Sequence, residues 1–183
     1  MHIAFYAPMK SPHHPHPSGD RRIARLLIKS LELAGHSVEL MSELRAWEGK
    51  GARAAQRTIQ QQAQQETEQM LSDIQARPAD RKPDIWFSYH LYHKAPDWIG
   101  PAVASQLNIP YFVAEASYAP RQKQGDWAPG LEQVKRALVQ ASAIICHNPR
   151  EIPALEQMAG VGDKLHLLKP FLDSDNIDAE QRQ

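Results

Sequence analysis

The stretch Ile85-Trp86-Phe87-Ser88-Tyr89 decides the fold class of this chain. It is short, almost entirely apolar, and preceded by the turn-forming pair Pro83-Asp84. A run of this kind is typical of a strand that is buried on both faces of a sheet. Five other short segments predict strands: 3–7, 37–41, 109–114, 143–146 and 164–168.

Segments with apolar side chains at helical spacing separate these predicted strands. They span residues 19–34, 52–75, 97–107, 131–139 and 148–160. The glutamine-rich stretch 52–75 keeps a narrow apolar stripe, which favours a surface helix over a disordered tract. Strands that alternate with helices predict a parallel sheet covered on both faces. The expected fold class is therefore α/β, with a doubly wound, mostly parallel, Rossmann-like sheet.

The last predicted helix has its own start signal. Asn148 suits the N-cap, Pro149 suits the first helical position, and Glu151 lies where it can complete a capping box. Pro153 lies deeper in the segment, so we expect a distorted first turn.

Length and composition exclude several classes of protein. The 183 residues fit one domain, and 21 basic against 21 acidic side chains give a net charge near zero, which argues against a nucleic-acid partner. The single cysteine, Cys146, lies in an apolar run, so a disulfide framework and a cysteine zinc site within the chain are excluded. No segment approaches the ~20 apolar residues of a membrane span, and the start does not resemble a signal peptide. We expect a cytoplasmic protein.

In doubly wound sheets, ligands bind beyond the carboxyl ends of the strands, and this rule selects the candidate site residues. Gly19 begins a predicted helix, where free N–H groups favour an anion, although it could merely ease a turn. After the third predicted strand come Tyr89, His90 and His93, whose rings and polar atoms suit a sugar or nucleoside. A structural histidine that caps the strand is the alternative.

A carboxylate, Glu115, ends the fourth predicted strand. A buried carboxylate is costly unless it is paired or used. Glu115 is therefore a candidate base or sugar contact, with a salt bridge to Arg121 or Lys123 as the structural alternative. The loop His13-His14-Pro15-His16 could bind a transition metal or an anion, but prolines hold the histidines apart, so we expect a solvated loop.

Four pieces of the sequence, in this order and spacing, resemble a known family. They are Ile3–Pro8 with the Gly19 loop and the turn Ala34-Gly35-His36-Ser37-Val38, then Lys82-Pro83-Asp84-Ile85, then Ala141–Asn148, and then Lys164–Leu168 followed by Asp173. Together they resemble the N-terminal domain of GT-B glycosyltransferases. The resemblance is in particular to the large retaining, family 4-like group that includes sucrose synthases and bacterial mannosyltransferases.

The resemblance implies sugar transfer from a nucleotide-diphosphate sugar to a glycan, lipid or small-molecule acceptor, without a cofactor or a metal. Residues 1–173 would form the acceptor-side domain, and 174–183 would begin a linker to a donor-binding C-terminal domain that is missing from the sequence. The chain alone would then be inactive or nearly so, and a peripheral membrane contact would be compatible with it. The implied catalytic residues are Glu115 and His90, and the implied substrate-binding residues are Gly19, Tyr89, His93, Ser117, Tyr118 and Asn148.

The sequence departs from the family pattern at two strand ends. The family often has a histidine after the fourth strand, where this chain has Ala114-Glu115-Ala116-Ser117, so Glu115 or a histidine from 89–93 could substitute for it. The family's Asn-Gly-Val-Asp is replaced by Pro170-Phe171-Leu172-Asp173.

Two other functions stay open. One is a non-enzymatic Rossmann-like binding module or a subunit of a split enzyme. The other is a dinucleotide-dependent enzyme, which the missing Gly-x-Gly-x-x-Gly fingerprint disfavours.

Overall fold

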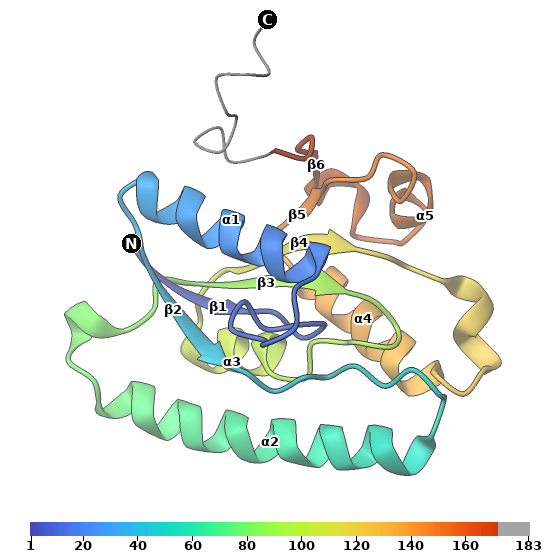
Figure 1. Cartoon of the computed structure of the whole chain (residues 1–183), viewed down its shortest axis with the longest axis horizontal. Coiled ribbons are helices and arrows are strands. Elements are labelled where there is room, and N and C mark those ends of the chain that lie inside the picture. Colours follow the sequence, from blue (N-terminus) through green and yellow to red (C-terminus); the bar gives the residue numbers. More distant parts are fainter. Residues whose placement is uncertain (172–183) are drawn as a thin grey trace, which may run out of the picture.

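The computed structural model describes residues 1–171, which form one six-stranded, all-parallel sheet (Figure 1). Its spatial order is β2-β1-β3-β4-β5-β6. The strands are β1 (His2–Tyr6), β2 (Ser37–Ser42), β3 (Ile85–Leu91), β4 (Tyr111–Ala116), β5 (Ala143–Cys146) and β6 (Leu165–Leu167). The chain moves from β1 to β2 on one side and then to β3 on the other, so the strand order reverses between β1 and β3. This reversal is the switch point where doubly wound sheets bind ligands.

Helices cover both faces of the sheet, which confirms the predicted doubly wound α/β class. They are α1 (Gly19–Leu33), α2 (Arg53–Ala76), α3 (Gly100–Leu107), α4 (Ala128–Gln140) and α5 (Ile152–Glu156), with short 3-10 helices at Ala79–Arg81, Pro120–Gln124 and Gly162–Lys164. On one face, α1 packs on a core that includes Phe5, Phe87 and Tyr89. On the other face, side chains of the remaining α-helices join a larger core around Trp86 and Tyr111.

The sequence defines both ends of α1. The Ser18 hydroxyl accepts a hydrogen bond from the Arg21 backbone N–H at 3.2 Å and so caps the first turn. Gly35, with φ +84°, ends the helix in the left-handed conformation that glycine adopts most easily. Between these ends, Ala24, Leu26 and Leu27 face the sheet.

The glutamine-rich segment is the helix α2, as predicted. Five of its side chains are buried and form the thin stripe that the sequence indicated: Ala63, Thr67, Met70, Leu71 and Ile74. The helix ends before Pro78, which cannot continue it. None of the helices in residues 1–171 combines the length and the apolar character that crossing a bilayer requires.

The predicted start of the last helix was wrong. The helix α5 begins at Ile152, and the Asn148 side chain instead accepts the backbone N–H of Arg150 at 3.1 Å within a preceding turn. A helix that started at Pro149 would place Pro153 in its interior, where proline removes a backbone hydrogen bond. Starting at Ile152 puts Pro153 in the first turn, where an N–H has no helical partner anyway.

A buried carboxylate fixes the start of α3, three residues later than predicted. Asp97 is fully buried, and it accepts the backbone N–H groups of Ile99 at 2.9 Å and Gly100 at 2.7 Å. Its other oxygen accepts the hydroxyls of Ser88 and Tyr111. The first turn of α3 is thereby tied to β3 and β4.

Replacing Gly100 by alanine should destabilise the protein by about 1–3 kcal/mol, because a Cβ there would collide with the Asp97 carboxylate and the Trp86 indole. Urea unfolding followed by circular dichroism measures the change. Gly19→Ala is the matched control, since no heavy atom lies within 4 Å of its Cβ position. Equal stability of the two variants would contradict the tight packing around Asp97.

Candidate functional site

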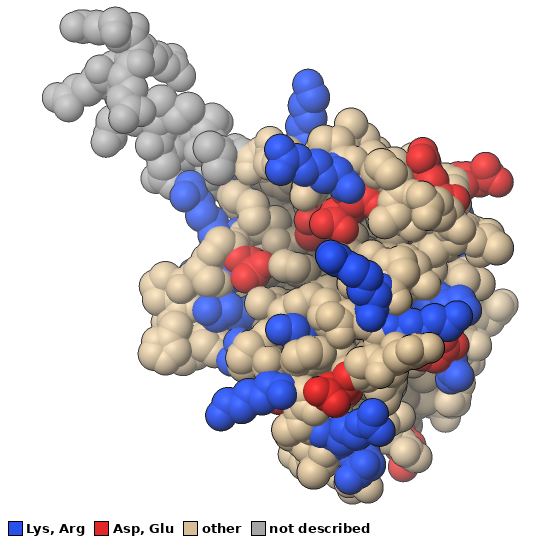
Figure 2. All heavy atoms as spheres, turned by 90° about the vertical axis from the view of Figure 1, so that its right-hand side faces the viewer, with Lys and Arg blue, Asp and Glu red and all other residues tan. Residues whose placement is uncertain are grey.

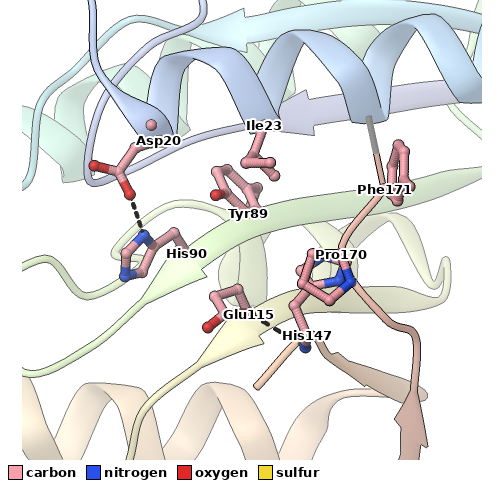
Figure 3. Close-up of a pocket in the computed structure, with 9 residues that line it drawn as sticks. Asp20, Ile23, Tyr89, His90, Glu115, His147, Pro170 and Phe171 are labelled. Carbon is pink, nitrogen blue, oxygen red and sulfur yellow. Dashed lines mark hydrogen bonds and ion pairs between the residues drawn. The ribbon is translucent and has the colours of Figure 1, made fainter. Parts of the chain in front are cut away.

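A cavity of about 300 Å³ opens at the carboxyl ends of the strands, beside the N-terminus of α1 (Figure 3). Its lining residues come from α1, from the ends of β3 and β4, and from the segments that follow β5 and β6. They are Gly19, Asp20, Ile23, Tyr89, His90, Glu115, His147, Pro170 and Phe171. Four of the eight residues proposed from the sequence are among them: Gly19, Tyr89, His90 and Glu115.

Figure 2 shows the face toward which the strands of Figure 1 point. Lys and Arg side chains are spread over this face, with Asp and Glu side chains between them, and no broad patch of one charge covers it.

His90 and Glu115 reach the cavity through an unusual backbone conformation. Both have positive φ, +63° and +60°, in a region that residues other than glycine rarely occupy. Side chains alternate between the faces of a strand, yet Trp86 and Leu91, five residues apart, lie in the same core. His90 is the extra residue that breaks this alternation.

The neighbouring strand repeats the break at the same level. Tyr111 and Ala116, again five residues apart, share that core, and Glu115 is the extra residue. Because β3 and β4 pair in register, with Tyr89 opposite Ala114, both breaks occur side by side. The two polar side chains are therefore presented together at the sheet edge, while the apolar side chains continue the core below them.

His90 forms a hydrogen-bonded pair with Asp20. Its Nδ1 lies 2.7 Å from Oδ1 of Asp20, and the two side chains are 26% and 27% exposed. A carboxylate only accepts, so Nδ1 carries the proton, and in the neutral ring Nε2 is left as an acceptor. The hydrogen bond from His90 lowers the pKa of Asp20, and partial burial opposes the shift.

Glu115 is oriented by backbone rather than by a cation. Its Oε2 accepts the backbone N–H of His147 at 3.2 Å. Within residues 1–171, no ion pair joins it to Arg121 or Lys123, which were the structural alternative in the sequence. The carboxylate therefore faces the cavity without a cationic partner in the described structure.

His147 borders the cavity with one nitrogen engaged. Its Nδ1 donates to the carbonyl oxygen of Leu168 at 2.9 Å, which leaves Nε2 as an acceptor in the neutral ring. The side chain is 9% exposed, and Nε2 has no hydrogen-bond partner in the described part of the chain. The ring of Phe171 packs edge-on against it, with centroids 6.3 Å apart.

The rest of the lining is apolar or neutral. Ile23 from α1, Pro170 and Phe171 form one wall, and the Tyr89 ring lies between them and His90 (Figure 3). Burial raises the pKa of Tyr89, and the nearby charges of Asp20 and Glu115 raise it further. Tyr89 therefore remains an uncharged phenol across the physiological pH range.

The other proposed residues lie outside this cavity. His93 packs edge-on against Trp127, and burial lowers its pKa. Ser117 donates its backbone N–H to Leu91, and Tyr118 packs on the larger core. Asn148 is exposed.

The loop of residues 13–16 is anchored at the surface by one side-chain pair. His13 pairs with Glu43 at 2.7 Å, and both side chains are more than half exposed. In residues 1–171, no group of three or more His, Cys, Asp or Glu side chains is placed to hold a metal ion.

Sequence reasoning did not select five of the lining residues. Asp20 adjoins Gly19, and His147 adjoins Asn148 directly after the predicted strand at 143–146. The strand-end rule pointed to both places, but only Gly19 and Asn148 were proposed as site residues. Ile23 belonged to the expected inward stripe of α1. Pro170 and Phe171 carry no local signal, because only the return of the chain after β6 brings them to the cavity.

The sequence matches no protein-family model and no curated protein. Solved structures do match the fold. A UDP-glucosyltransferase from Polygonum tinctorium capable of glucosylating indoxyl, solved with 3,4-dichloroaniline, aligns with a TM-score of 0.54 and 13% identity over 94% of this chain and 53% of the enzyme. Apo UGT2 from Phytolacca americana aligns with a TM-score of 0.53 and 12% identity over 99% of this chain and 54% of that protein.

The same Phytolacca americana protein, complexed with UDP-2-fluoro-glucose and pterostilbene, aligns with a TM-score of 0.52 and 13% identity over 94% of this chain and 55% of that chain. The chain thus spans about half the length of the structures it matches. At this identity the likeness concerns the fold alone, and the narrower resemblance to the retaining group stays a prediction. The chain has the Rossmann-like fold of one half of a GT-B glycosyltransferase.

Proposed function

We propose that this chain is the acceptor-holding, N-terminal half of a nucleotide-sugar glycosyltransferase, in which His90 takes the proton from the acceptor hydroxyl. The observation that carries the proposal is the His90–Asp20 pair at the edge of a cavity, at the switch point of the sheet. Residues 1–173 would form this half, and the segment 174–183, which lies outside the described residues, would lead to the donor-binding half.

The chemistry follows from the geometry of the pair. An acceptor hydroxyl in the cavity would donate to Nε2 of His90, the nitrogen that Asp20 leaves free. As the hydroxyl oxygen bonds to the anomeric carbon of the donor sugar, its proton moves to Nε2 and the bond from the sugar to the nucleoside diphosphate breaks. The carboxylate of Asp20, 2.7 Å from Nδ1, would stabilise the imidazolium that forms.

Glu115 would act beside this pair as a second polar contact. Within residues 1–171, its carboxylate accepts one backbone N–H, so it can accept hydrogen bonds from further donors on the acceptor. Tyr89 and Phe171 would pack against the apolar body of the acceptor, and Gly19, which has no side chain, would leave space for the acceptor to approach the start of α1.

The composition of the cavity supports holding the nucleotide elsewhere. A diphosphate is bound most often by Arg, Lys or metal ions. The nine residues that line the cavity include Asp20 and Glu115 and neither Lys nor Arg. A separate donor-binding half agrees with this, as does the match of the chain to about half of each solved enzyme.

In the enzyme assembled from this chain and its donor-binding half, His90→Ala should lower kcat by roughly 10²-fold or more, because the proton acceptor is lost. The rate of nucleoside diphosphate release, measured with a panel of nucleotide sugars and aromatic alcohols, tests this. His93→Ala is the matched control, since His93 does not line the cavity. Near-normal turnover of His90→Ala would exclude the proposed base. Ligand binding without transfer from any donor would favour a binding module instead.

His90→Ala should also raise the pKa of Asp20, because the hydrogen bond from His90 is the main cause of its lowering and burial would then act unopposed. Carboxyl NMR titration measures this pKa directly. His13→Ala, which removes the exposed pair with Glu43, should leave Asp20 unchanged.

The same pair should make stability depend on pH. A lowered Asp20 pKa stabilises the fold above the unfolded value of about 3.9, and this contribution is lost as the pH falls through the lower folded value. The difference in unfolding free energy between the wild type and His90→Ala should therefore narrow below about pH 4. An unchanged difference down to about pH 2 would argue against the ion pair.

A further inference from the structure

We propose that the cavity selects a positively charged acceptor: a small, flat, apolar body that carries a protonated amine, with the ammonium group against Glu115. The inference rests on the proposal that this cavity holds the acceptor, and it adds the chemical class of that acceptor.

The charges at the cavity favour a cationic ligand. Asp20 is paired with His90, but Glu115 receives one backbone N–H and no ion pair from the described residues. Among the described residues that line the cavity there is no Lys or Arg. A partly buried carboxylate without a counter-ion is unfavourable, and a cation supplied by the ligand removes that cost.

The hydrogen-bonding groups at the cavity favour a ligand that donates hydrogen bonds. The neutral ring of His90 presents Nε2 as an acceptor, and His147 carries an Nε2 that is enclosed by the protein and has no partner in residues 1–171. With the Glu115 carboxylate, these groups all require donors. An ammonium group has three donors and no acceptor, whereas a carboxylate or phosphate ligand has no donor to offer.

The size and the apolar walls of the cavity favour a small, flat ligand. A volume of about 300 Å³ is at the small end for ligand cavities and suits one ring with a short side chain. Tyr89 and Phe171 offer aromatic surfaces, and Ile23 and Pro170 complete the apolar wall. Aromatic faces beside a carboxylate favour a cation further, because the ring quadrupole attracts positive charge.

The positive N-terminal end of the α1 dipole would favour an anionic ligand rather than a cation, but its charge is already compensated. A helix N-terminus favours an anion. Here Asp20 places a carboxylate in the first turn, and the Ser18 hydroxyl accepts the Arg21 N–H. The negative charge that the helix end favours is therefore supplied by the protein itself.

Three probes of one scaffold and different charge test the inference on the whole chain. Tyramine carries an ammonium, tyrosol a hydroxyl in its place, and para-hydroxyphenylacetate a carboxylate. Isothermal titration calorimetry near pH 7 should give the affinity order tyramine, tyrosol, para-hydroxyphenylacetate, with roughly tenfold between the first two. The preference for tyramine should shrink at high salt.

Glu115→Gln should remove the preference for tyramine over tyrosol. Glu132→Gln is the matched control, because it changes the net charge equally at an exposed helix position that pairs with Arg136. It should keep the preference. Circular dichroism verifies that each variant is folded, and the order of the three probes on the wild type decides the matter if Glu115→Gln does not fold.

The outcomes separate this inference from the proposed function. Equal or weaker binding of tyramine than of tyrosol, or a preference that persists in folded Glu115→Gln, overturns the charge selection and leaves an acceptor cavity for neutral ligands. Binding of none of the probes at millimolar concentration overturns the charge selection and also counts against the acceptor cavity.

Discussion

The buried carboxylate of Asp97 joins β3, β4 and the start of α3, and the site includes residues from the ends of β3 and β4. The carboxylate accepts hydroxyl hydrogen bonds from Ser88 on β3 and Tyr111 on β4, and backbone N–H bonds at the start of α3. Burial raises the pKa of Asp97, and these hydrogen bonds oppose the shift. Because His90 and Glu115 lie one residue before the ends of β3 and β4, the network fixes the relative position of the two strands from which the site projects.

Above this network, His90 on β3 and Glu115 on β4 interrupt the regular strand geometry at the same level of the sheet. Left-handed conformations at His90 and Glu115 cost of order 1–3 kcal/mol each, and such costs persist only where the surroundings enforce them. Leu91 and Ala116, which follow them, return to a tightly buried core. The packing below thus holds two polar residues in an arrangement that neither would adopt alone, which is the pattern expected of a site rather than of a loop.

The sequence was sufficient for the fold because local patterns determine it: each apolar run became a strand, and the thin stripe of 52–75 became α2. It was sufficient for Tyr89, His90 and Glu115 because they lie within three residues of the carboxyl ends of β3 and β4. The pairing of His90 with Asp20 spans 70 residues, so no local pattern could predict it. The left-handed conformations of His90 and Glu115 could not be predicted either, because Gly or Asn is the usual sequence signal for such a conformation.

One wall of the cavity connects it to the segment that follows β6. Pro170 and Phe171 belong to the segment that leaves the last strand, yet they contact the same space as α1 and His147. A molecule in that space would therefore favour one path for the departing backbone. By thermodynamic linkage, whatever holds the backbone on that path would tighten binding of the molecule by the same factor. Binding in the cavity and the path of the Pro170–Phe171 segment are therefore thermodynamically coupled.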